Sequence, residues 1–404
     1  MHHGMLTIYK EKGYTSSDAV ARLRGILRMR KIGHTGTLDP DAEGVLPMCL
    51  GNATRICELI ADREKEYLAV MRLGVLTDTQ DMSGEILSQV PEERIREILL
   101  NDERISGGTE DLLSDERISG ETEDLLSDER ISGGTPEENR IIVEKILTAA
   151  SSFTGEIEQI PPMYSAVKVN GKRLYDMARK GITVERKPRR ITIYSLQIEE
   201  VNLPLVRLRV RCSKGTYIRT LCEDLGNALG TGAAMQSLLR TRVGQFTLDE
   251  ALTLDEVERI AKTESEKLPG LIQPVDSFFA DLPAAECTDE ALRLLKNGNV
   301  LTVREIRFLK QDEDPLVRPA AGAGGPDNTE KDLQDDAGTG SAGSPDFKSS
   351  GREETRTSLP GIGPREQVIR MYDREGRFFG LYRSGPDRRG HGRYQAYKMF
   401  LPQD

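Results

Sequence analysis

Residues 34–43 read His-Thr-Gly-Thr-Leu-Asp-Pro-Asp-Ala-Glu, and the run continues as Gly44-Val45-Leu46. One aspartate, Asp39, stands between a Gly-Thr-Leu run and a proline. Because proline disfavours the α region for the residue before it, Asp39 belongs to a turn between apolar segments and not to a helix interior. A carboxylate at such a corner is either a structural turn residue or a nucleophile presented to a substrate.

Further motifs follow this run in a fixed order along the chain. They are Lys65-Glu66-Tyr67, Ile160-Pro161-Pro162-Met163-Tyr164-Ser165-Ala166-Val167-Lys168, Gly171-Lys172-Arg173-Leu174-Tyr175, Ser213-Lys214-Gly215-Thr216-Tyr217-Ile218-Arg219 and Leu238-Leu239-Arg240-Thr241. Together with residues 34–46, they resemble the tRNA pseudouridine-55 synthase family of the TruB type. The resemblance covers residues 6–300 apart from one insertion, and it implies that Asp39 is the nucleophile of a uridine-to-pseudouridine isomerisation.

The resemblance also implies catalytic partners for Asp39. Arg219 is the implied cation that keeps the pKa of Asp39 low despite burial, and Tyr67 is implied to stack on the uracil and to take part in proton transfer. Tyr217 and Leu238 are implied as walls of the base pocket, since an extruded base needs aromatic and apolar faces. From residue patterns alone, such an arginine is more often a surface or phosphate contact, and such tyrosines are more often ordinary half-buried strand residues.

The substrate is expected to be the T-arm stem-loop of tRNA, from which the target uridine must be flipped before attack. His34 is implied as the side chain that fills the vacated place in the RNA loop. Basic side chains near the motifs are candidate phosphate contacts: Lys10, Lys65, Lys168, Lys172 and Arg173.

Isomerisation changes no oxidation state and releases no group, so we expect neither a cofactor nor a metal. The chain has no P-loop and no Gly-x-Gly-x-x-Gly motif after a strand. Five cysteines without a Cys-x-x-Cys pair predict buried free thiols in a reducing cytoplasm, with zinc or disulfides improbable. No apolar run is long enough to span a bilayer, which predicts a cytoplasmic protein.

The net charge of −10 is unevenly distributed. Residues 101–135 hold eleven acidic and three basic side chains, and residues 311–360 hold eleven and five. The two segments therefore carry net charges of −8 and −6, and the rest of the chain carries a net charge of +4. Residues 168–190 carry nine Lys or Arg against two acids, and residues 22–31 carry five against none. Such basic clusters fit either a solvated face or phosphate contact.

Two segments are predicted to be disordered. Residues 102–134 repeat Asp-Glu-Arg-Ile-Ser-Gly with a period of thirteen and contain too few apolar side chains to stack as a solenoid. They interrupt helical segments expected at 91–100 and 136–150. Residues 311–365 are rich in Gly, Ala, Pro, Ser and Asp and predict a loop or linker.

We expect two domains of an α+β protein. Ser17 is a candidate N-cap for a helix, and strands are expected at 67–73, 191–201 and 206–212. In the last strand, Arg207, Arg209 and Arg211 alternate with apolar residues, which fits a solvated face or a wall of an RNA groove. The resemblance implies a bent mixed, largely antiparallel sheet in residues 1–284 (with the acidic insertion 101–135) and a small PUA-like RNA-binding β-barrel in residues 285–404, interrupted by the 311–365 loop.

Two functions remain open at this stage. The first is a stand-alone tRNA-modifying isomerase of the bacterial type, expected to act as a monomer without a protein partner. The second is a non-catalytic RNA-binding or tRNA-folding protein on the same scaffold. The presence of both Asp39 and Arg219 favours the enzyme, because a pure binder has no need of a buried carboxylate in an RNA cleft. A guide-RNA-dependent relative would be expected to be strongly basic, unlike this chain.

Overall fold

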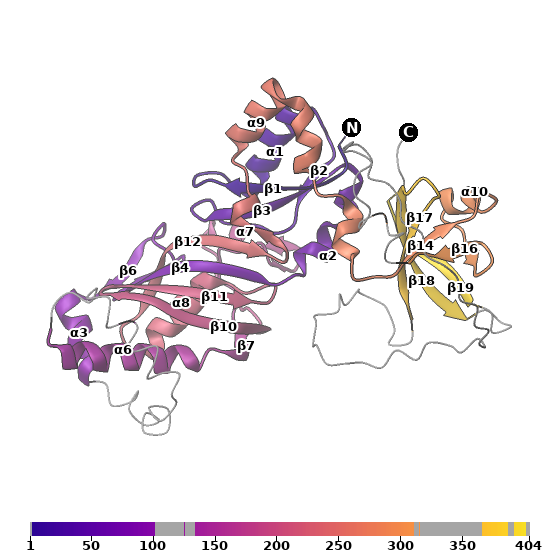
Figure 1. Cartoon of the computed structure of the whole chain (residues 1–404). Coiled ribbons are helices and arrows are strands. Elements are labelled where there is room, and N and C mark those ends of the chain that lie inside the picture. The colour runs from indigo at the N-terminus through magenta and orange to yellow at the C-terminus, as the bar shows by residue number, and fades with distance from the viewer. Residues whose placement is uncertain are drawn as a thin grey trace, which may run out of the picture. The chain divides into compact units, whose positions relative to one another are not determined.

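The computed structural model of the chain describes residues 2–101, 125, 134–310, 315, 366–386 and 392–400. The predictions for the acidic repeat and for the 311–365 segment lie almost entirely outside these residues. The chain divides into two compact units, 1–273 and 274–404 (Figure 1). This division lies eleven residues before the expected domain boundary at 284/285, because residues around Asp276 and Phe279 contact Tyr372 and Phe400 of the second unit.

The first unit is built on a nine-stranded mixed sheet with the order β1-β3-β12-β4-β11-β10-β7, where β2 joins β3 and β13 joins β12. Only β3 and β12 pair in parallel, so the sheet is largely antiparallel, as predicted. The strands are β1 (Gly4–Lys10), β2 (Ile32–His34), β3 (Glu43–Leu50), β4 (Lys65–Leu73), β7 (Gly155–Gln159), β10 (Arg189–Asn202), β11 (Leu205–Cys212), β12 (Ala233–Val243) and β13 (Phe246–Thr247).

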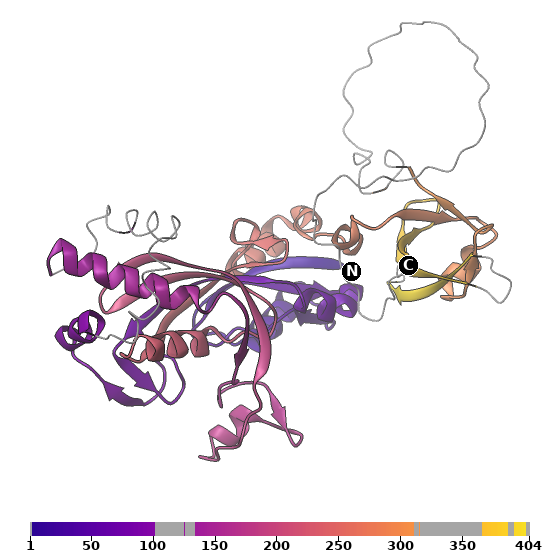
Figure 2. The same cartoon turned by 90° about the horizontal axis from the view of Figure 1, so that it is seen from below.

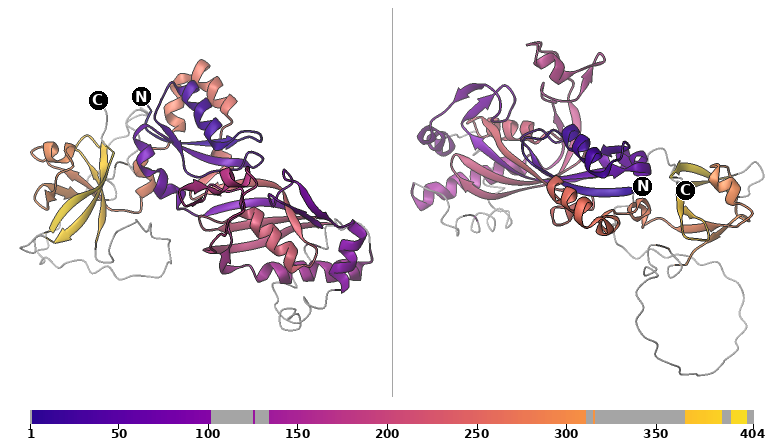
Figure 3. Two further views of the ribbon diagram at one scale, coloured as in Figure 1. Left: turned by 180° about the vertical axis from the view of Figure 1, so that it is seen from behind. Right: turned by 90° about the horizontal axis from the view of Figure 1, so that it is seen from above.

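Two short hairpins extend this unit. They are β5 (Val75–Thr77) with β6 (Ile86–Gln89), and β8 (Lys168–Val169) with β9 (Lys172–Arg173). The second hairpin and the following helix α7 (Leu174–Ala178) project away from the sheet (Figures 2 and 3). The basic stretch 168–190 therefore begins in a projection of the chain.

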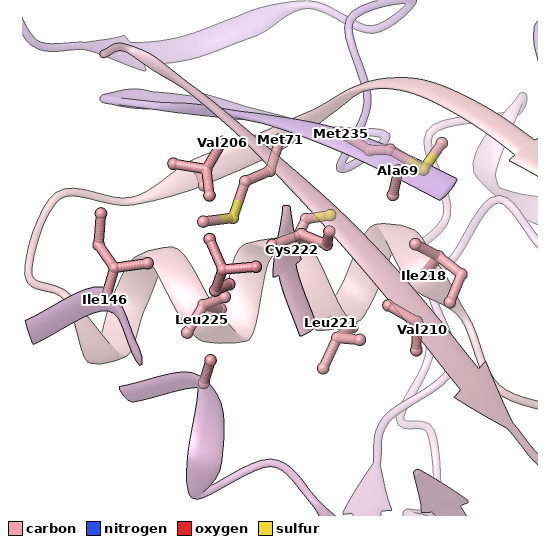
Figure 4. Close-up of a cluster of buried hydrophobic side chains, with 14 of the residues drawn as sticks. Ala69, Met71, Ile146, Val206, Val210, Ile218, Leu221, Cys222, Leu225 and Met235 are labelled. Carbon is pink, nitrogen blue, oxygen red and sulfur yellow. The ribbon is translucent and has the colours of Figure 1, made fainter. Parts of the chain in front are cut away.

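Helices cover the sheet in two groups. The α-helices of this unit are α1 (Ser16–Leu27), α2 (Cys57–Ala61), α3 (Glu92–Asn101), α6 (Pro136–Ser151), α7, α8 (Ile218–Ala228) and α9 (Leu254–Thr263), and the 3-10 helices are η1 (Gly51–Ile56), η3 (Leu248–Glu250) and η4 (Ser265–Leu271). The apolar face of α8 packs on β4 and β11 through Leu221, Leu225 and neighbours such as Met71 and Val210 (Figure 4). This core fixes the first turn of α8 against the sheet.

Helix α1 begins two residues earlier than expected. The side chain of Thr15, not Ser17, caps it, since Thr15 accepts from the backbone N–H of Asp18 and the Asp18 carboxylate accepts from Thr15 in return. This reciprocal arrangement satisfies two backbone donors that a Ser17 cap would leave open. The helix then buries Val20 and Leu23 against β1 and β3.

The arginine row on β11 faces carboxylates. Arg209 pairs with Glu66 and Glu199, Arg207 with Glu200, and Arg211 with Glu64. Because each guanidinium already has an anionic partner on a neighbouring strand or turn, the structure favours the solvated charged face over the RNA-groove wall.

One cysteine prediction is wrong. Cys49 of β3 and Cys57 at the start of α2 form a disulfide, because the single short helix η1 between them brings their Cα atoms within 6.3 Å. Cys212, Cys222 and Cys287 are free and buried, as expected.

The second unit contains a six-stranded sheet with the order β15-β19-β18-β17-β14-β16. Its elements are η5 (Val275–Phe279), β14 (Ala284–Cys287), α10 (Leu292–Lys296), β15 (Leu301–Thr302), β16 (Ile306–Phe308), β17 (Val368–Tyr372), β18 (Phe378–Pro386) and β19 (Gly392–Met399). Strands β17 and β18 pair antiparallel and form a hairpin. No helix among the described residues is long and apolar enough to cross a membrane.

Candidate active site

Asp39 lies in the loop that joins β2 to β3. The loop is tied down on both sides of it. Ser16 accepts a hydrogen bond from the Leu38 N–H at 2.9 Å, and the Lys10 ammonium donates to the Pro40 carbonyl at 3.2 Å. The Asp39 carbonyl accepts from Ala42 N–H at 3.1 Å, which closes a turn. Asp39 is therefore a turn residue in its backbone, while its side chain remains free to face a ligand.

The side chain of Asp39 meets Arg219, the second residue of α8. The distance from Arg219 Nε to Asp39 Oδ2 is 3.1 Å. The arginine side chain is 6% exposed and the aspartate side chain 41%. Burial raises the pKa of the Asp39 carboxyl above its ordinary value, and the Arg219 charge acts in the opposite direction. The guanidinium thus favours the ionised carboxylate that a nucleophile requires.

Arg219 is itself held by four groups. Besides Asp39, it bonds the carboxylate of Asp81 at 3.3 Å, the carbonyl of Thr79 at 3.0 Å and the carbonyl of Tyr164 at 2.8 Å. These partners come from the β5–β6 loop and from the Pro-Pro-Met-Tyr-Ser motif. Because the fork of the guanidinium is engaged on every side, its orientation toward Asp39 is fixed.

Sequence reasoning missed Asp81. It lies in the acidic turn after β5, where its carboxylate also accepts from Thr79 and Ser83. The Thr-Asp-Thr-Gln-Asp run at 77–81 is recognisable as a turn, but nothing local connects it with Arg219. After Asp39, the carboxylate of Asp81 is the second negative charge beside the buried Arg219 guanidinium.

These residues line a cleft of about 920 Å³. Asp39, Arg219 and Leu238 lie together in its wall, so three of the predicted site residues converge. Other lining residues come from the β5–β6 loop, the 164–166 motif, α7 and β12; they include Asp78, Asp81, Tyr164, Ser165, Tyr175, Arg179, Met235 and Gln236. Among the described residues, no group of three or more His, Cys, Asp or Glu side chains is arranged to hold a metal.

Three predicted residues do not line this cleft. Tyr67 on β4 is 8% exposed, and it stands opposite Arg240 of the adjacent strand β12. Tyr217 precedes α8, and its backbone exchanges two hydrogen bonds with the Gln159 side chain. His34 ends β2, where its Nδ1 accepts from the Gly36 N–H at 3.3 Å. Burial lowers the pKa of His34, so the neutral imidazole is favoured.

The lysine predictions separate into two classes. Lys10 is fully buried, and its ammonium donates to the carbonyls of Glu11, Tyr14 and Pro40. Lys65 is also buried, and it donates to the carbonyls of Ala61 and Arg63. Burial lowers the pKa of each lysine to about 8.

Both ammonium groups bond carbonyl oxygens of nearby turns in this structure, and the phosphate contacts expected of Lys10 and Lys65 stay predictions. Lys168 and its neighbours Lys172 and Arg173, in contrast, are exposed on the projecting hairpin.

Comparisons with known proteins identify one family. A model of the "TruB family pseudouridylate synthase (N terminal domain)" matches residues 24–104 and 117–218, and the "tRNA pseudouridylate synthase B C-terminal domain" matches 219–280. A Clostridium tetani protein named tRNA pseudouridine synthase B is 38% identical over 307 residues, covering 76% of this chain and 88% of its own. A Lachnoclostridium phytofermentans protein of the same name is 43% identical, covering 74% and 84%.

Comparison with solved structures identifies the fold. The structure titled "Crystal Structure of a Cbf5-Nop10-Gar1 Complex" matches with a TM-score of 0.53 and 23% identity over 99% of this chain and 85% of that chain. "Crystal structure of the archaeal box H/ACA sRNP Nop10-Cbf5 complex" matches with a TM-score of 0.51 and 21% identity, covering 100% and 87%. The chain thus has the pseudouridine synthase fold with a PUA-like C-terminal sheet. By its motifs, its family-model matches and its relatives, the chain belongs to the TruB family of pseudouridylate synthases.

Proposed function

We propose that this enzyme isomerises the uridine at position 55 in the T-loop of tRNA, with Asp39 as the nucleophile. As a TruB-family enzyme, the chain converts uridine to pseudouridine in tRNA. The observation that supports the role of Asp39 is its ion pair with the buried Arg219 in the wall of the 920 Å³ cleft. A structural turn carboxylate would need no such buried cation.

The pair supports a covalent mechanism. Arg219 holds Asp39 ionised and directs one carboxylate oxygen, while the pinned loop restrains the backbone around it. An ionised aspartate can hold one fragment of the substrate while the N–C glycosidic bond is broken and the base turns. Leu238 supplies an apolar surface in the same cleft, and we assign Tyr67 to proton transfer and Tyr217 to the outer wall of the base pocket.

We assign RNA recognition to the projecting β8–β9 hairpin and to His34 at the start of the loop that carries Asp39. The exposed Lys168, with Lys172 and Arg173, extends from the sheet on the β8–β9 hairpin, a placement that suits phosphate contact. His34 is proposed to fill the place of the flipped uridine; a neutral imidazole suits insertion among bases.

We further propose a division of labour between residues 1–284, which carry catalysis, and residues 285–404, which bind RNA through the PUA-like sheet. The first strand of that sheet, β14, begins at Ala284. The enzyme is proposed to act as a monomer on the T-arm of tRNA. Its proposed location is the cytoplasm, where tRNA is found.

Position specificity can be tested with a T-arm stem-loop RNA. We expect mass-based mapping to find one pseudouridine, at the position equivalent to 55, after incubation with the purified chain. The control RNA carries cytidine at that position and should contain no pseudouridine. Modification at other uridines of the loop, or binding without any modification, would contradict the proposal; the second result would favour the RNA-binding alternative.

A further inference from the structure

Arg240 lies where three strands of the active-site sheet meet. On β12, it stands opposite Tyr67 of β4 on one side and opposite Gly44 of β3 on the other. It is 1% exposed. A Cβ atom at Gly44 would lie 2.2 Å from the Arg240 carbonyl oxygen, so β3 approaches this residue as closely as glycine permits. Arg240 thus joins the strand of Tyr67 to the end of the loop that carries Asp39.

The guanidinium contacts both of these elements. Its Nε donates to the Val45 carbonyl at 2.7 Å, and one terminal nitrogen donates to the Gly36 carbonyl at 3.4 Å. The Tyr67 side chain stands beside Arg240 on the neighbouring strand, and the two groups interact electrostatically. Gly36 and Val45 flank Asp39 in the loop, so a single side chain links both flanks of the nucleophile loop to the tyrosine.

The positive charge of Arg240 has no anionic partner. Across the described part of the chain, no carboxylate forms an ion pair with it, whereas Arg219 and Arg242 each have two. A buried cation without a counter-ion is costly, so a negative charge that forms beside it during function would be stabilised. Among the described residues, Tyr67 is the neighbour on the adjoining strand whose ionised form the Arg240 charge favours.

Burial disfavours the charged form of both groups, and each group partly offsets that effect on the other. Burial raises the pKa of the Tyr67 phenol, and Arg240 acts against this rise. Burial lowers the pKa of Arg240, and Tyr67 acts against this fall. Each group therefore stabilises the charged form of the other.

We propose that Arg240 is a positioning residue that prepares Tyr67 to remove the proton from C5 of the target uridine, while its bonds to Gly36 and Val45 fix the loop of Asp39. This inference rests on the proposed function. It assigns Arg240 to one step of the reaction, the deprotonation of C5, and not to cleavage of the glycosidic bond.

The step balances without a cofactor. Once C5 has bonded to C1′ of the ribose, C5 carries both the new bond and its hydrogen. Ionised Tyr67 takes that proton, the C5–H electron pair becomes the C5–C6 double bond, and the C6–N1 double bond moves its pair onto N1. N1 takes a proton from solvent, and Tyr67 returns its own to solvent. The net change moves one proton from C5 to N1, and Arg240 stabilises the phenolate throughout.

The test compares T-arm RNA with protium or deuterium at C5 of the target uridine, in single turnover. We expect Arg240→Met to slow product formation about 100-fold, within the usual range for general-base catalysis, and to enlarge the isotope effect over that of the wild type. Arg240→Lys, which keeps the charge, should restore part of the rate. In a Tyr67→Phe background, Arg240→Met should add little further loss, because the group it acts through is gone.

Arg242→Met is the matched control, since it removes an arginine two residues along the same strand that bonds Glu64 and Glu66 instead. It should keep the wild-type rate and isotope effect. The inference would be overturned if Arg240→Met were slow without a larger isotope effect. It would also be overturned if Arg240→Met lowered the rate equally with and without the Tyr67 hydroxyl, and Arg240 would then have only a structural role.

Melting temperature and T-arm affinity verify that each variant folds. If Arg240→Met does not fold, Arg240→Lys carries the same isotope test. Absence of product with the wild type would refute the proposed function, whereas normal wild-type turnover with an unchanged isotope effect in the variant refutes only the role of Arg240.

Discussion

Replacing Arg219 by glutamine should shift the pH dependence of catalysis. The proposed nucleophilic role requires Asp39 to be ionised, so kcat/KM should fall as the pH drops through the pKa of Asp39. Burial raises that pKa and Arg219 lowers it. Removing the cation therefore raises the pKa further, and the acidic limb of the kcat/KM profile should move to higher pH.

The size of the shift follows from the geometry. An opposite charge within a few ångströms of a carboxylate lowers its pKa by about 1–3 units. Because Asp39 is 41% exposed and shares the guanidinium with Asp81, solvent and the second carboxylate weaken this effect, so the acidic limb should move only modestly. Arg219 also bonds the carbonyls of Thr79 and Tyr164, so the variant should unfold at lower temperature, with a loss of about 1–3 kcal/mol in the free energy of unfolding.

The assay is release of tritium from C5 of the target uridine in T-arm RNA, measured from pH 5 to pH 9. Arg242→Gln is the control, because it removes an arginine that also pairs with two carboxylates but does not line the cleft. An Arg219→Gln variant that folds and keeps both the wild-type rate and the wild-type acidic limb would refute the electrostatic role of Arg219.

Three other perturbations test separate parts of the account. Tyr67→Phe should reduce turnover much more than RNA affinity, whereas Tyr67→Leu should weaken both; small and equal effects would make Tyr67 a structural residue. Lys10→Met should slow turnover about 100-fold, because the Pro40 carbonyl beside Asp39 loses its hydrogen-bond donor. If the variant instead binds RNA with a salt dependence weaker by about one phosphate contact, Lys10 contacts a phosphate. Replacing residues 102–134 by a short Gly/Ser bridge should preserve melting temperature and activity and tighten RNA binding at low salt only, since the repeat is acidic and poor in apolar residues; lost activity would show that the repeat is part of the folded enzyme.

Local patterns predicted the parts of the fold that depend on neighbouring residues. The alternation of Val206, Leu208 and Val210 with arginines predicted β11, and Pro40 predicted the turn at Asp39. The pairing of Asp39 with Arg219 came from resemblance to the family, because 180 residues separate them and no periodicity connects them.

Other features needed the tertiary structure. Lysines are mostly exposed in proteins, and nothing in the sequence shows that carbonyls of a nearby turn capture Lys10 and Lys65. Asp81 and Arg240 come near the site because β12 pairs with β4 in the large sheet and because Met235 of β12 forms an isolated bridge with Asp81 after β5. The disulfide between Cys49 and Cys57 likewise depends on how tightly η1 turns the chain.

The most direct test of the central claim is the product formed by Asp39→Asn. Wild type and variant would be incubated with the same T-arm RNA, and pseudouridine mapped by mass after one and many turnovers, with RNA affinity measured in parallel. The amide fills the same space and Arg219 keeps its bond to Asp81, so we predict wild-type affinity with no pseudouridine. Substantial pseudouridine formation by Asp39→Asn would contradict the account, because the nucleophile would then lie elsewhere.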